Sequence, residues 1–120
     1  KYKLDELFSE LTDGYDTNVG INGGNLSLGM QKVTTLIRGI SKDCKIIIFD
    51  EPLAGLDEKT RVKVIKLILN ECRNKTLIVI THDKEILPHM DRVINLNQLQ
   101  GKDKHVENKQ EGFRNYMSLY

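Results

Sequence analysis

Residues 45–52 read KIIIFDEP, and the fold class can be predicted from them. A short, continuous run of β-branched and aromatic residues is typical of a strand inside a parallel sheet, so we expect residues 45–49 to form a strand that is buried on both faces. Pro52 lacks the N–H group that another ladder hydrogen bond would need, and the strand should therefore end at Asp50 and Glu51. The sequence thus predicts two carboxylates at the carboxyl end of a buried strand.

A helix is predicted on each side of this strand. Ser27 is a natural N-cap for the first helix, and Asp57 can cap the second. Apolar residues recur at helical spacing in both segments, which gives each helix one face suited to packing against a sheet. The predicted stripes are Met30, Val33, Leu36 or Ile37, and Ile40 in the first helix, and Val62, Ile65, Leu69 and Cys72 in the second.

Two further strands follow. Residues 76–80 read TLIVI, and residues 92–96 are predicted as a third strand after a short helix that ends near Pro88. This alternation predicts an α/β fold, a layered domain with a mostly parallel sheet flanked by helices. Residues 4–11 are predicted as a short helix, 12–24 as loop and 112–120 as a terminal helix. We divide the chain into a loop-rich approach (1–25), a core (26–96) and a tail (97–120).

Composition limits the function classes. The chain has 120 residues, enough for one small domain, with 39% hydrophobic and 29% charged residues. Its net charge of +1 offers no overall attraction to nucleic acid or to an acidic membrane surface. The apolar run at residues 46–49 is far too short to cross a bilayer.

Cys44 and Cys72 lack the spacing of a disulfide framework or a metal site, which predicts free, buried thiols in a reducing compartment. Because the first residue is Lys1 and not methionine, we expect the chain to be a piece of a longer protein.

Reactive side chains follow two of the predicted strands. Asp50 and Glu51 follow the first, and His82 and Asp83 follow the strand at 76–80. Parallel strands present their carboxyl ends at one sheet edge, where open α/β sheets bind ligands. Mg²⁺ prefers one or two carboxylates together with water and phosphate oxygens, which suits Asp50, and Glu51 could orient or deprotonate an attacking water. Taken singly, the acidic pair is better explained as a loop cap and the histidine as a structural residue.

The start of the first helix is a second candidate site. Ser27 and Gly29 flank a helix N-terminus whose exposed N–H groups and positive dipole end suit an anion. When this segment is considered alone, a simple helix cap is its default explanation.

Three motifs stand in order along the chain: LSLG at 26–29, IIIFDEPLAGLD at 46–57 and ITHD at 80–83. Over about residues 13–96 they closely resemble the ATP-binding cassette (ABC) ATPase family. The first resembles its signature motif, the second its Walker B strand, catalytic glutamate and D-loop, and the third its switch histidine. Arg38 stands where the family usually has an arginine. The segment GYDTNVG at 14–20 resembles exporter-type cassettes, whereas THD is more typical of importer-like ones.

The resemblance implies an ATPase that uses ATP and Mg²⁺. Asp50 would hold Mg²⁺ through water, Glu51 would act as the general base on the attacking water, and His82 would contact the γ-phosphate. Ser27 and Gly29 would contact the nucleotide held by a second cassette.

Asp57, in the D-loop, would link the two nucleotide sites of such a dimer. The resemblance also implies a transmembrane domain as partner and a place on the cytoplasmic face of a membrane.

Two departures from the family pattern stand out. Leu28 replaces the usual glycine of the signature motif, and Met30 stands where glutamine is common. No Gly-x-x-x-x-Gly-Lys-[Ser/Thr] occurs in the chain, and the glutamine loop is also missing. The resemblance therefore implies a partial P-loop NTPase fold that lacks the phosphate-binding loop. Because phosphoryl transfer depends on positioning and charge neutralisation, we expect the chain to need the N-terminal lobe of its own domain, and to be inactive alone.

The leading hypothesis is the C-terminal half of the ATPase module of an ABC transporter. One alternative is the C-terminal ATPase lobe of a chromosome or DNA-repair protein, which also separates the two halves of the cassette; against it, no heptad pattern precedes the signature motif. Another is a cassette protein that acts on translation or another assembly instead of transport.

Overall fold

The computed structural model describes residues 1–96 and 115–119. Among them lie two α-helices, α1 (Leu28–Ile40) and α2 (Glu58–Glu71), and four strands. The strands are β1 (Ile46–Asp50), β2 (Thr76–Ile80), β3 (Arg92–Asn95) and β4 (Asn115–Leu119). Short 3₁₀ turns cover Asp5–Phe8, Gly14–Asp16, Ile21–Gly23 and Leu87–His89. The short helices predicted near residues 4–11 and before Pro88 are therefore 3₁₀ turns in the structure.

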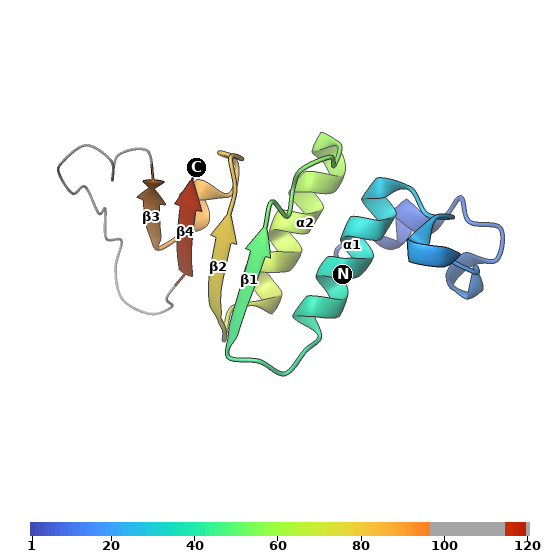
Figure 1. The fold of residues 1–120 in the computed structure, drawn as a ribbon, viewed down its shortest axis with the longest axis horizontal. Coiled ribbons are helices and arrows are strands. Elements are labelled where there is room, and N and C mark those ends of the chain that lie inside the picture. Colours follow the sequence, from blue (N-terminus) through green and yellow to red (C-terminus); the bar gives the residue numbers. More distant parts are fainter. Residues whose placement is uncertain (97–114, 120) are drawn as a thin grey trace.

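The strands form one parallel sheet in the order β1-β2-β4-β3 (Figure 1). The predicted parallel α/β arrangement is thus confirmed, as are the strands at 45–49, 76–80 and 92–96 to within one residue. The terminal helix predicted at 112–120 is wrong where it can be compared, because residues 115–119 form β4; residues 112–114 and 120 lie outside the described residues. Backbone pairing with β2 on one side and β3 on the other outweighs the weak local preference of this segment.

Both predicted helix caps are present. The Ser27 hydroxyl accepts a hydrogen bond from the Met30 N–H, and the Asp57 carboxylate accepts one from the Thr60 N–H. Each cap therefore satisfies one of the N–H groups that the first turn of a helix leaves without a partner.

The apolar stripe of α1 is largely as predicted, with Met30, Val33 and Leu36 buried. The stripe predicted for α2 is wrong in part, because Val62 is 43% exposed. A neighbouring set of α2 side chains is buried instead, and it packs in one hydrophobic core with residues of β1 and β2. The buried residues of α2 are Thr60, Val64, Ile65, Leu67 and Ile68.

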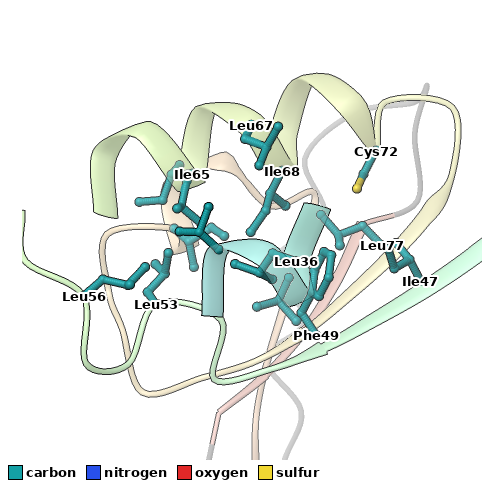
Figure 2. Close-up of a cluster of buried hydrophobic side chains, with 14 of the residues drawn as sticks. Leu36, Ile47, Phe49, Leu53, Leu56, Ile65, Leu67, Ile68, Cys72 and Leu77 are labelled. Carbon is teal, nitrogen blue, oxygen red and sulfur yellow. The ribbon is translucent and has the colours of Figure 1, made fainter. Parts of the chain in front are cut away.

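The hydrophobic core lies between the two helices and one face of the sheet (Figure 2). On β1, Ile47 and Phe49 point into this core, whereas Ile46 and Ile48 are 58% and 61% exposed. The prediction that this strand is buried on both faces is therefore wrong, because its second face is largely exposed in the part of the chain that the structure describes. Within this part of the chain, no helix is long and apolar enough to cross a membrane.

Candidate functional site

The carboxyl ends of β1 and β2 lie level with each other, as expected for parallel neighbours. Asp50 is the register partner of Ile80, and the Glu51 N–H continues the ladder by donating to the Ile80 carbonyl at 2.8 Å. An open depression of about 900 Å³ lies at this edge. Its lining residues are Asp50, Glu51, Ala54, Arg61, His82, Asp83, Lys84 and Glu85. The structure thus brings together the acidic pair and the histidine that the sequence singled out.

Glu51 is held in place through its carboxylate. Thr81 donates its hydroxyl hydrogen to Oε2 at 3.0 Å, and the backbone N–H of His82 donates to Oε1 at 3.1 Å. The Nε2 atom of His82 lies 3.8 Å from the same Oε1. Hydrogen bonds to both carboxylate oxygens limit the positions that the Glu51 side chain can take. The arrangement offers a fixed, half-buried base at the rim of an open depression.

The backbone of Glu51 is unusual as well. Its φ angle is +45°, in the left-handed region that residues with a Cβ seldom adopt. Such a conformation persists only where the surroundings enforce it, and it is often found at functional positions. Here it turns the chain sharply between β1 and Pro52, directly after the strand ends.

Asp50 is exposed at the same edge. No group of three or more His, Cys, Asp or Glu side chains capable of holding a metal ion occurs among the described residues. A single exposed carboxylate nevertheless fits Mg²⁺, because this ion keeps most of its waters and takes its other ligands from phosphate oxygens. The chemistry of Asp50 is therefore compatible with a Mg²⁺ site that nucleotide and water would complete.

The start of α1 lies apart from this depression: neither Ser27 nor Gly29 lines it. The Ser27 oxygen accepts from Met30 at 3.2 Å, which leaves its O–H able to donate to an anion. Leu28 is 78% exposed, so its side chain projects outward at the helix start. Leu28 and Asp50 both line a second depression of about 540 Å³ between α1 and β1.

Asp57 caps α2 and faces solvent. Hydrogen bonds from the Thr60 side chain and backbone lower the pKa of this carboxyl. The residue is thus a charged, exposed group at the end of the turn that follows β1.

Three residues around the site, Thr81, Lys32 and Arg61, were not predicted from the sequence to have a role. Thr81 belongs to the ITHD motif, and its completely buried hydroxyl contacts Glu51. Lys32 donates to the Glu51 and Ala54 carbonyls, and Arg61 forms an ion pair with Asp83 at 3.1 Å. A polar residue directly after a buried strand was the available signal for Thr81. Lys32 and Arg61 lie on helices with no local pattern to mark them.

No protein-family model matches the chain. Among curated proteins it is 33% identical over 119 residues to "ABC transporter ATM1" of Plasmodium falciparum, which covers 97% of this chain and 11% of that protein. It is 30% identical over 116 residues to "Alpha-hemolysin translocation ATP-binding protein HlyB" of Escherichia coli. It is 31% identical over 116 residues to "Toxin RTX-I translocation ATP-binding protein" of Actinobacillus pleuropneumoniae.

The last two similarities each cover 93% of this chain and 16% of the relative. The chain therefore spans less than a fifth of the length of the curated relatives it matches. All three relatives are ABC transporters or translocation ATP-binding proteins by name, and their similarity extends over nearly the whole of this chain. Exporter-type cassettes fit this set. Together with the three motifs in order and the carboxylates gathered at one sheet edge, these similarities show that the chain belongs to the ATP-binding cassette ATPase family.

Proposed function

We propose that this chain is the C-terminal half of the ATP-binding and ATP-hydrolysing module of an ABC transporter, in which ATP-driven dimerisation is coupled to transport. The observation that carries the proposal is the placement of Glu51. Its carboxylate is fixed by Thr81 and by the His82 N–H, beside an exposed Asp50, where two parallel strands end.

In the proposed reaction Glu51 is the general base. A carboxylate held by two donors keeps one defined orientation, which is what a base needs to accept a proton from an attacking water. Asp50 would hold Mg²⁺ through water, and the metal would neutralise charge on the phosphates. His82, at the same edge, would donate a hydrogen bond to the γ-phosphate.

The start of α1 would contact the ATP that is bound by the second cassette of the dimer. Ser27 and Gly29 do not line the depression that holds Glu51, which supports a role toward ATP bound by a second cassette. Asp57 would link the two sites from its exposed position at the start of α2. ATP would favour the closed dimer, and hydrolysis would release it, as in any ligand-driven population shift.

The missing phosphate-binding loop would come from the N-terminal lobe of the same domain. The exposed face of β1 supports this, because parallel sheets are normally covered on both faces and Ile46 and Ile48 lie open to solvent. The cradle of backbone N–H groups and its lysine supply most phosphate contacts in P-loop proteins. The chain alone is therefore expected to bind ATP weakly and not to hydrolyse it.

A transmembrane domain is the proposed partner outside the ATPase module, at the cytoplasmic face of a membrane. This proposal is supported by the names of two relatives, which describe the translocation of α-hemolysin and of an RTX toxin. Those names describe the relatives' own cargo.

The test is nucleotide binding and hydrolysis by this chain mixed with a polypeptide that supplies the N-terminal lobe. We expect Mg·ATP binding to be restored, Asp50→Asn to weaken it, and Glu51→Gln to abolish hydrolysis while binding remains. The proposal fails if the mixture binds no nucleotide, or if hydrolysis survives in Glu51→Gln.

A further inference from the structure

Lys32 connects α1 to the turn that carries Glu51. Its Nζ atom donates to the Glu51 carbonyl at 2.7 Å and to the Ala54 carbonyl at 2.9 Å. The bond to Glu51 is partly buried, whereas the bond to Ala54 is exposed to solvent. An ammonium group has three donors, and here at least two of them go to backbone oxygens of one tight turn.

This turn is the segment in which Glu51 adopts its left-handed conformation. Besides the bond from Lys32, the Glu51 carbonyl accepts one from the Ala54 N–H at 3.3 Å. Both lone pairs of that carbonyl oxygen are therefore engaged. Because donors that carry a charge form the stronger hydrogen bonds, Lys32 makes the larger contribution to holding the carbonyl where it is.

Glu51 is consequently fixed from three directions. Its N–H is bound by Ile80 of β2, its carboxylate is bound by Thr81 and the His82 N–H, and its carbonyl is bound by Lys32. Lys32 alone among these groups comes from α1, which begins at Leu28 directly after its N-cap Ser27.

We propose that Lys32 is a positioning residue for Glu51, tying the helix start that would face the partner's nucleotide to the general base for the chain's own nucleotide. This inference rests on the proposed function. If the tie is lost, the turn can relax toward ordinary backbone angles, and the carboxylate then moves relative to the attacking water. A shift of about 1 Å in a catalytic group can cost on the order of a hundredfold in rate.

A positioning role has a signature that a purely structural role lacks. Lys32 does not itself contact the nucleotide in the proposed reaction, so its removal should lower kcat and leave the KM for Mg·ATP nearly unchanged. Loss of folding would instead lower the amount of active protein and reduce the melting temperature.

The experiment uses the complete cassette, assembled from this chain and its N-terminal lobe. We expect Lys32→Met to lower kcat by about 10- to 100-fold with KM changed by less than about twofold. Lys32→Arg, which can still donate to two carbonyls, should recover most of the rate. The matched control is Lys66→Met, since Lys66 is an exposed lysine of α2 outside both depressions; it should leave kcat and KM unchanged. Unchanged kcat in Lys32→Met, or a rise in KM alone, would overturn the inference.

Comparing Glu51→Gln with Lys32→Met shows whether the proposed function or only the inference about Lys32 is wrong. If Glu51→Gln retains hydrolysis, the proposed function itself fails. If Glu51→Gln abolishes hydrolysis but Lys32→Met has normal kcat, only the inference about Lys32 fails. Amide hydrogen exchange in the 120-residue chain gives a readout without nucleotide: the Ala54 N–H should exchange faster in Lys32→Met than in Lys66→Met. Equal exchange in the two variants would show that Lys32 does not hold the turn.

Discussion

The Thr81 hydroxyl donates a hydrogen bond to Oε2 of Glu51 at 3.0 Å from a side chain that is completely buried. The hydroxyl oxygen of Thr81 in turn accepts a hydrogen bond from the Asp83 N–H, also at 3.0 Å. One hydroxyl group therefore fixes both the proposed general base and the backbone that follows His82. This buried hydroxyl therefore links Glu51, at the end of β1, to Asp83, which follows β2.

Replacing Thr81 by Val tests this arrangement. Valine has nearly the same shape but no hydroxyl, so the Asp83 N–H loses its acceptor and Glu51 loses a donor. We expect the free energy of unfolding, measured by urea denaturation, to fall by about 1–3 kcal/mol. Thr81→Ser keeps the hydroxyl and is the control; it should lose much less. Equal losses in the two variants would mean that the methyl group matters more than the hydrogen bonds.

Arg61 holds the segment that follows His82 from the side of α2. Its guanidinium forms ion pairs with Asp83 at 3.1 Å and Glu85 at 3.5 Å, and it donates to the Leu56 carbonyl at 3.4 Å. The Arg61 and Asp83 side chains are only 30% and 15% exposed, so water screens this pair less than an ordinary surface pair.

A double-mutant cycle with Arg61→Met and Asp83→Asn should give a coupling energy of about 1 kcal/mol or more. The matched control is Lys59 with Glu6, a pair 3.8 Å apart with side chains 80% and 47% exposed, for which we expect a coupling near zero. Urea denaturation of the single and double variants measures both. A coupling for Arg61 and Asp83 no larger than that of the control would contradict the prediction.

Gly29 offers a way to separate folding from function. A methyl group at this position would lie 3.8 Å from Leu56 Cδ2 and 3.9 Å from Ser27 Oγ, which are ordinary contact distances. Gly29→Ala should therefore fold normally, and it should gain about 0.5–1 kcal/mol because alanine is the better helix former.

In the complete cassette the same methyl group would stand between the helix start and the partner's nucleotide. We expect ATP hydrolysis by Gly29→Ala to drop by about tenfold or more while thermal stability holds or rises, since preorganised donors at the phosphate contribute strongly to the rate. Full hydrolysis by this variant would argue against Gly29 as a nucleotide contact.

The buried thiol of Cys72 should make the free energy of unfolding depend on pH. Burial raises the pKa of its thiol to about 11 from the ordinary value of 9.0. Between these two values the unfolded chain loses the thiol proton while the folded chain keeps it. The folded state then binds more protons, so the free energy of unfolding falls as the pH rises through this window, and the contribution is fully present only below about pH 9.

The measurement is the stability of the native chain and of Cys72→Ala by urea denaturation at a series of pH values between about 8 and about 11. Other groups titrate in both proteins, so the difference between the two curves isolates Cys72. We expect the advantage of the native chain to shrink as the pH rises. A constant difference would mean that the thiol is not desolvated in the folded state.

Much of the secondary structure followed from local chemistry. Ser27 and Asp57 each accept a hydrogen bond from an N–H three residues along the chain, so the caps they form could be recognised from neighbouring residues alone. The strand at 46–50 likewise follows from its own run of β-branched residues. The terminal helix was wrong because pairing with distant strands decides the structure of that segment: residues 115–119 pair as β4 between β2 and β3.

Residues close together in the chain encode the motifs, the two helix starts and the carboxylates at the end of β1, so these features can be read without the fold. Long-range packing sets which face of β1 is buried. It also brings Thr81 to the Glu51 carboxylate and Lys32 to the Glu51 carbonyl. Thr81 lies 30 residues after Glu51 and Lys32 lies 19 residues before it. Contacts across such separations arise from how the sheet and α1 pack, and no local pattern of residues encodes them.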